Sequence, residues 1–153
     1  MHVIVATDGS KQSLAAAHKL MSFADPARIT DVSVVAVIRP LAAVAFADEL
    51  SEQDHPQLFS DALSFRNAAQ NALDVIAAEF TGWGPEVHTL IRSGSPANEI
   101  IKAAQAVDAG LIVVASGGGG LSETVLLGST AQRVQHYAPC PVLVVRPELR
   151  ESR

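Results

Sequence analysis

The stretch Gly110–Pro147, GLIVVASGGGGLSETVLLGSTAQRVQHYAPCPVLVVRP, decides the fold of this chain. Its opening run LIVVA, Leu111–Ala115, is β-branched and free of polar residues, as expected for a strand buried on both faces. Four glycines follow at 117–120, and a helical pattern and a proline-bounded strand at Val142–Val145 come after them. This order of strand, glycine-rich loop, helix and strand is typical of a parallel α/β sheet.

The glycine run and the start of the following helix together predict an anion site. Glycine accepts positive φ values and allows main-chain N–H groups to approach a ligand closely. Ser129 and Gln132 form a Ser-x-x-Gln arrangement that can cap a helix reciprocally. The unpaired N–H groups and the dipole of a helix that begins at Ser129 favour phosphate. Taken singly, the glycines equally suit a mobile turn, and Ser129 suits an ordinary N-cap.

Composition sets the class of protein. The 153 residues predict one domain over 1–147 without repeat or linker, and a short charged tail at 148–153. A net charge of −5 without a basic block argues against a nucleic-acid partner. No apolar run approaches the ~18 residues of a membrane span, and the amino terminus lacks the pattern of a signal peptide. With Cys140 as the only cysteine, we expect a cytoplasmic protein without a membrane partner.

The rest of the chain alternates between strand and helix patterns. Strands are predicted at His2–Thr7, Val32–Ile38 and Glu86–Ile91, and helices at Leu14–Phe23, Gln57–Phe80 and from Ser95-Pro96 onward. Such alternation implies parallel strands with helices on both faces of one sheet. The irregular residues 40–57 form a segment that could overhang a site. Asp8, directly after the first strand, has two open roles: a turn or cap carboxylate, or a group that faces a ligand crevice.

Several catalytic motifs are missing from the sequence. It contains neither the phosphate-binding loop with its lysine, nor Gly-x-Gly-x-x-Gly after the first strand, nor a Gly-x-Ser-x-Gly elbow. The five histidines show no recognisable metal-ligand spacing, so no metal site is predicted. Cys140, between two prolines, is interpreted as a small packed hydrophobe. The sequence therefore offers no catalytic residues, and we expect no efficient catalysis.

Four fragments of the sequence resemble the universal stress protein family. They are the spacing Gly118-x9-Gly128-Ser129, the strand PCPVLVV at Pro139–Val145, the opening VIVATDGS at 3–10, and GSPANEI at 94–100. The resemblance covers nearly the whole of residues 1–147. One departure is Ala115, which occupies the position of the family's first motif glycine.

The resemblance implies a fold, a ligand and an assembly. The fold is a single open five-stranded parallel sheet of order 3-2-1-4-5, with helices on both faces, similar to the adenine nucleotide alpha hydrolases. The ligand is ATP, with Mg²⁺ carried on its phosphates, and the assembly is a homodimer paired through the terminal strand Val142–Val145. Carried over by position, the residues beside the nucleoside are Ala6, Asp8 and Val37, and those of the phosphate motif are Ala115, Gly118, Gly128, Ser129 and Thr130.

Three functions follow as hypotheses. The first is a dimeric regulatory protein of the stress response that binds ATP. The second is a dimeric interaction or scaffold protein with a vestigial pocket, because an added methyl group at Ala115 costs about 1–3 kcal/mol where a site is tight. The third is a slow ATPase or phosphoryl-transfer enzyme that uses Ser129 or Thr130 as acceptor. Dimerisation also has a physical motive, since an apolar edge strand invites pairing.

Overall fold

The computed structural model describes residues 1–38, 56–116 and 128–147. Its strands are β1 (His2–Thr7), β2 (Asp31–Ile38), β3 (Glu86–Ser93), β4 (Leu111–Ala115) and β5 (Val142–Val145). Its helices are α1 (Lys11–Phe23), the short 3₁₀ helix η1 (Pro26–Arg28), α3 (Pro56–Glu79), α4 (Pro96–Ala106) and α5 (Ser129–Tyr137). None of the helices in these ranges has the length and apolar character needed to cross a bilayer. The glycines 117–120, the tail 148–153 and most of the irregular segment 40–57 lie outside the described residues.

The strands form one parallel sheet in the order β3-β2-β1-β4-β5, as the family resemblance implies. β1 pairs in parallel with β2 on one side and β4 on the other, and β3 and β5 form the two edges. Because every strand runs in the same direction, the carboxyl ends of all five lie along one edge of the sheet. In an open α/β sheet this edge is where ligands bind.

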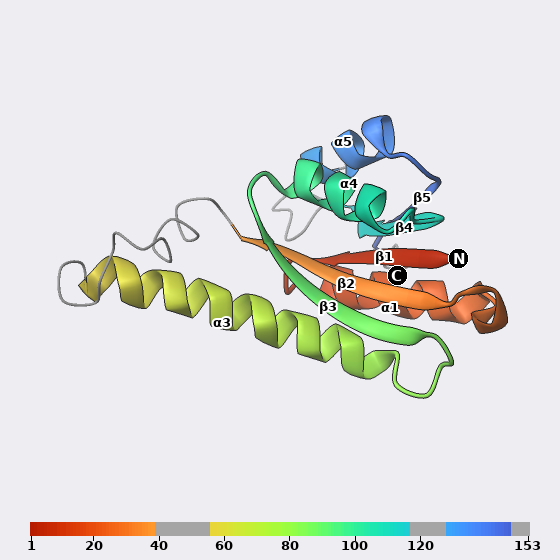
Figure 1. Cartoon of the computed structure of the whole chain (residues 1–153), viewed down its shortest axis with the longest axis horizontal. Coiled ribbons are helices and arrows are strands. Elements are labelled where there is room, and N and C mark those ends of the chain that lie inside the picture. Colours follow the sequence, from red (N-terminus) through yellow and green to blue (C-terminus); the bar gives the residue numbers. More distant parts are fainter. Residues whose placement is uncertain (39–55, 117–127, 148–153) are drawn as a thin grey trace, which may run out of the picture.

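Helices cover both faces of the sheet, as predicted (Figure 1). α1 and α3 lie on one face, and α4 and α5 lie on the other. Alternate residues of β1 point to opposite faces: Val3 and Val5 pack with α1 and α3, whereas Ile4 packs with α4 and α5. All three side chains are at most 1% exposed, which explains why the strand reads as an uninterrupted apolar run.

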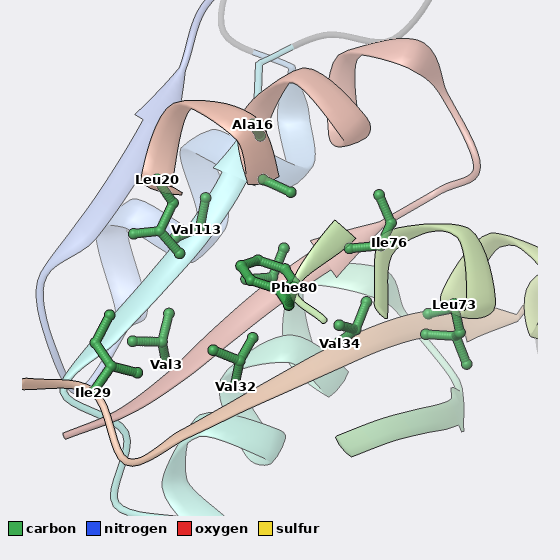
Figure 2. Close-up of a cluster of buried hydrophobic side chains, with 13 residues drawn as sticks. Val3, Ala16, Leu20, Ile29, Val32, Val34, Leu73, Ile76, Phe80 and Val113 are labelled. Carbon is green, nitrogen blue, oxygen red and sulfur yellow. The ribbon is translucent and has the colours of Figure 1, made fainter. Parts of the chain in front are cut away.

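The larger core cluster lies between the sheet and the pair α1 and α3 (Figure 2). Phe80 follows α3 directly and is 1% exposed, and its side chain lies between α1 and the sheet. Its ring also meets the ring of Trp83, with 5.6 Å between the centroids. Leu20 of α1 and Leu73 and Ile76 of α3 complete the helix side of this cluster. The carboxyl half of α3 is therefore the part that holds the helix on the sheet.

The helix starts differ in how their first N–H groups are satisfied. Ser10 caps α1, because its hydroxyl oxygen accepts from the backbone N–H of Ser13 at 3.2 Å. Ser95 occupies the N-cap position of α4, as predicted, but its side chain makes no capping hydrogen bond. The prediction of a reciprocal cap at Ser129 is wrong. Gly128 is the N-cap of α5, and no side-chain capping hydrogen bond is formed there by the described residues.

An ion pair joins the end of β3 to the first turn of α4. Arg92 donates its Nε–H to Glu99 Oε2 at 2.8 Å, and this hydrogen bond is the main reason that the pKa of the Glu99 carboxyl lies below its ordinary value. The Glu99 side chain lies against Gly94, where φ is +142° and a Cβ atom would lie 2.8 Å from Oε1. Glycine at 94 therefore lets the carboxylate reach Arg92, and the turn between β3 and α4 is fixed.

Phe80→Ala tests whether the core beneath α3 sets the stability of the fold. The free energy of unfolding should fall by about 3–5 kcal/mol, because the change leaves a large cavity in a fully buried cluster. Phe65→Ala is the matched control on α3, since Phe65 is 60% exposed, and it should change stability by less than about 0.5 kcal/mol. Urea denaturation followed by circular dichroism measures both. Equal losses would contradict this account of the core.

Candidate functional site

A cavity of about 880 Å³ opens at the carboxyl ends of β1 and β2, between the first turn of α1 and residues 61–76 of α3. Its volume falls in the range of about 300–1,000 Å³ that is typical of small-molecule sites. Most of its wall is apolar and comes from alanine and valine side chains of β2 and α3. The polar part comes from the turn into α1 and from Asp61 and Asn71 of α3. Its lining residues are Thr7, Asp8, Gly9, Ser10, Lys11, Ser13, Leu14, Ala36, Val37, Ile38, Asp61, Phe65, Ala68, Ala69, Asn71, Ala72, Val75 and Ile76.

Asp8 closes the turn after β1 and also lies on the wall of the cavity. Its Oδ1 atom accepts from the backbone N–H of Ser10 at 2.9 Å, which closes a turn between β1 and α1. Gly9, with φ +81°, supplies the backbone conformation that this turn requires. Thr7 Oγ1 accepts from the Gly9 N–H at 3.1 Å and lies 2.8 Å from Ser13 Oγ, so the turn is tied to both strand and helix. The Asp8 carboxylate is thus held on the cavity wall and remains exposed.

The other two residues expected beside a nucleoside lie differently. Val37 lines the cavity at the end of β2. It also packs against the second core cluster, the cluster beneath α4 and α5, which includes Ile4 and Ile112. Ala6 packs against that same cluster and is not part of the cavity wall. The structure therefore brings Asp8 and Val37 together on one cavity and leaves Ala6 beside it.

The start of α5 lies at the same edge of the sheet, because α5 runs back against the direction of β4 and β5. Gly128 and Thr130 are half-buried and Ser129 is exposed, and none of the three lines the cavity. The backbone N–H of Gln132 donates to the Gly128 carbonyl at 3.0 Å, as in an ordinary first turn. Within the described residues no side-chain hydrogen bond caps the amino end of this helix. Gly118 falls outside the described residues.

Ala115, the departure from the family motif, fits its position without strain. Among the described residues only Asp108 combines a side chain with positive φ, so Ala115 has an ordinary strand conformation. Its methyl group packs against the cluster beneath α1 and α3, and its strand partner is Val145. The methyl group therefore points into the core, and the position makes no demand for glycine.

Ser116 is a residue at this edge that the sequence analysis missed. It follows β4 directly and is 0% exposed, and its hydroxyl has no hydrogen-bond partner among the described residues. Its backbone N–H donates to the Val145 carbonyl at 2.9 Å, which fixes it beside β5. A buried hydroxyl without a partner costs about 1–3 kcal/mol, so such groups call for a functional explanation. In the sequence, the feature that could have indicated Ser116 is its position between a buried strand and a run of glycines.

Cys140 behaves as the sequence predicted. The side chain is half-buried and packs with the cluster beneath α4 and α5. Burial, with a smaller contribution from the charge of Asp108, raises the pKa of its thiol. A thiol with a raised pKa is a poor nucleophile at neutral pH. Its role is packing.

The sequence pattern of the Universal stress protein family matches residues 1–146. The chain belongs to this family. Universal stress protein MJ0531 of Methanocaldococcus jannaschii is 35% identical over 149 residues, which cover 97% of this chain and 84% of that relative. The match spans every described element, including the turn at Asp8 and the start of α5.

Solved universal stress protein structures share the fold. One, a family protein from Arabidopsis thaliana with AMP bound, superposes with a TM-score of 0.67 at 16% identity and covers 97% of this chain and 92% of its own. Another, a universal stress protein in complex with cAMP, has a TM-score of 0.63 at 24% identity, with 95% and 96% of the two chains covered. Both of those proteins hold an adenine nucleotide.

Ala115→Gly tests whether the departure at this position has a structural cost. The free energy of unfolding should fall by roughly 0.5–1 kcal/mol, as for glycine in a strand interior. Thermal unfolding measures the effect. A gain in stability would instead mean that the methyl group strains this strand.

Proposed function

We propose that this universal stress protein binds an adenine nucleotide, ATP foremost, and acts as a dimeric regulatory protein of the cytoplasmic stress response. The observation that carries the proposal is the cavity of about 880 Å³ bounded by Asp8 and Val37, at the same sheet edge as an uncapped helix start. The relatives that hold AMP and cAMP support the choice of an adenine nucleotide. ATP itself is inferred from the Gly118, Gly128 and Ser129 spacing.

The cavity suits the nucleoside part of the ligand. Its apolar wall, formed by Val37 and by alanines of α3, offers a dry surface for the flat adenine ring. The Asp8 carboxylate has acceptor capacity beyond its bond to Ser10, and ribose hydroxyls are suitable donors. Ala6, next to the cavity, leaves room for this contact because its side chain is small. The nucleoside would therefore lie across the ends of β1 and β2.

The start of α5 suits the phosphates. Gly128, Ser129 and Thr130 present backbone N–H groups that are not capped by any side chain in the described parts of the chain, and the helix dipole adds a partial positive charge there. The hydroxyls of Ser129 and Thr130 add two further donors. Gly118 completes the motif by position in the sequence. Mg²⁺ would be bound to the phosphates, as is usual where only a few carboxylates are near.

We propose a binding role rather than a catalytic one. Neither histidine nor cysteine is among the described residues of the cavity wall, so a side chain suited to activate water at neutral pH is lacking there. Asp8, one of its carboxylates, is engaged in the turn with Ser10. Hydrolysis, where it occurs, would accordingly be slow. The vestigial-pocket alternative loses its motive, because the Ala115 methyl group packs into the core.

The dimer follows from the exposed edge of the sheet. β5 pairs with β4 on one side only, and all four of its residues, Val142–Val145, are half-buried. An apolar edge strand presents unpaired backbone groups to any similar strand. Antiparallel pairing of β5 with β5 of a second copy would satisfy these groups and cover the valines. We therefore place the dimer contact on β5.

Calorimetric titration with ATP and Mg²⁺ tests the binding proposal. Wild-type protein should give a binding heat and a rise in melting temperature at millimolar ATP. Asp8→Ala should weaken binding by roughly 10- to 100-fold, because hydrogen bonds to a charged group contribute about 1.5–3 kcal/mol. Asp25→Ala is the matched control, since Asp25 Oδ1 closes a turn of the same kind with the Ala27 N–H at 3.0 Å, before β2.

A second pair of variants tests the position of the ligand. Ala68 lies on the cavity wall and is exposed, so Ala68→Trp should fill the cavity and abolish binding without loss of the fold. Ala78→Trp, at an exposed position of α3 outside the wall, should bind ATP normally. Absence of binding by the wild-type protein would overturn the proposal. Normal binding by Ala68→Trp would overturn the placement.

Analytical ultracentrifugation tests the dimer. Wild-type protein should sediment as a dimer, and Val144→Lys should shift it to monomer, because a charge on an edge strand opposes pairing. Val75→Lys adds the same charge to α3, at a side chain that is 53% exposed, and should remain dimeric. Circular dichroism shows whether each variant is folded. A monomeric wild type, or a dimeric Val144→Lys, would contradict the contact on β5.

A further inference from the structure

Three metal-ligating side chains converge at the amino ends of β2 and β3, far from the cavity. Asp31, Glu86 and His88 each present one ligand atom, and these atoms all lie within 4.8 Å of one another. His88 Nε2 and Asp31 Oδ1 are only 3.0 Å apart. In the described part of the chain no other group of three or more histidine, cysteine or acidic side chains meets this condition. The cluster therefore differs from the scattered surface charges around it.

The register of the sheet produces this convergence. Asp31 of β2 is the direct neighbour of Glu86 of β3, and Ser33 is the neighbour of His88. Successive side chains of a strand alternate between faces, so Glu86 and His88 point to the same side of β3. This is the side of α4 and α5, because Val87 between them packs against the opposite cluster. Asp31 points to the same side, because Val35, four residues further along β2, packs with the cluster beneath α4 and α5. Three side chains thus share one face without any loop to position them.

A second histidine lies beside the cluster, and the cluster itself is accessible to solvent. His2, the neighbour of Asp31 on β1, hydrogen-bonds through Nε2 to Ser33 Oγ at 2.7 Å. Its ring lies 6.1 Å from that of His88, centroid to centroid. The side chains of His88 and Asp31 are 44% and 30% exposed, so an ion can reach them from solvent. Strand residues with such neighbours are well suited to hold ligands in a fixed geometry.

The donor set selects the kind of ion. One imidazole nitrogen and two carboxylate oxygens are ligands that Zn²⁺ accepts, and the two negative charges balance the charge of the ion. Ligand atoms around a tetrahedral zinc ion lie roughly 3.3 Å apart, given bonds of 2.0–2.1 Å. The 3.0 Å between His88 Nε2 and Asp31 Oδ1 is close to that value, and Glu86 is exposed on the same strand and free to adjust its rotamer. Water would supply the fourth ligand.

We propose that Asp31, Glu86 and His88 form a binding site for a divalent transition-metal ion of the Zn²⁺ class at the amino ends of β2 and β3, on the face of the sheet that carries α4 and α5. The site lies at the opposite edge from the proposed nucleotide site. The distance along β2 from Asp31 to Val37, six residues further on, is about 20 Å. The ion would bind with or without nucleotide, and it joins β2 to β3 at the start of both strands.

Titration of nucleotide-free protein with ZnCl₂ in a calorimeter tests the proposal. Wild-type protein should bind one Zn²⁺ per chain, and MgCl₂ should give no comparable heat. His88→Ala should weaken Zn²⁺ binding at least roughly tenfold, since loss of even an outer-shell partner costs 10- to 100-fold. Glu86→Gln should weaken it as well. Replacement by Co²⁺ should give the visible absorption of a tetrahedral site in wild type and not in His88→Ala.

His18→Ala is the matched control. His18 Nε2 lies 2.8 Å from Glu79 Oε2, so it forms a histidine–carboxylate pair of the same kind on the surface, without belonging to a group of three. Its loss should leave the affinity for Zn²⁺ unchanged. Equal weakening by His18→Ala and His88→Ala, or no binding by the wild type, would overturn the proposal. Asp8→Ala should bind Zn²⁺ normally, so failure of the nucleotide proposal and failure of the metal proposal are distinguishable.

Discussion

The central strand β1 is hydrogen-bonded to a strand on each side and covered by helices on each face, so the side chains of its middle residues Val3, Ile4 and Val5 are buried. Val3 and Val5 contact one helical layer and Ile4 contacts the other. A strand in this position can exist only if both layers are present, which requires helical crossovers and strands that all run the same way. The direction of the strands in turn places their carboxyl ends along one edge. The cavity at Asp8 and the start of α5 lie at that edge for this reason.

Local patterns predicted the elements well because burial on both faces leaves a strong trace in the sequence. The runs at Leu111–Ala115 and Val142–Val145 have the predicted bounds, and α3 follows from apolar residues at helical spacing. The start of α5 was predicted less accurately. Ser129 carries the residue type of a cap, yet it is the first helical residue, and Gly128 before it occupies the N-cap position. The strand order came from the family resemblance, because pairing partners are distant in sequence.

The sites divide into parts that are local in sequence and parts that are not. Asp8 could be selected because it follows a strand directly, and its role in the turn needs only Ser10. The consequence of Ala115 depends on the direction of a methyl group, which only packing against α1 and α3 determines. The cluster of Asp31 and His88 depends on the register between β2 and β3, and the sequence places those residues 57 positions apart. The spacing of residues along the chain therefore did not indicate a metal site, although Glu86 and His88 lie two residues apart on the same side of one strand.

The length of α3 exceeds that of the sheet that it covers. Its 24 residues span about 36 Å, whereas the eight residues of β2 span about 26 Å. Leu73 and Ile76 anchor the carboxyl half of α3 in the core, whereas Phe65 in the amino half is largely exposed. The amino half is therefore stabilised mainly by the helix's own hydrogen bonds. Phe65 nevertheless forms part of the cavity wall. A molecule that fills the cavity therefore adds tertiary contacts to the part of α3 that has few. Ligand binding in the cavity and the helical state of the amino-terminal turns of α3 are consequently linked thermodynamically.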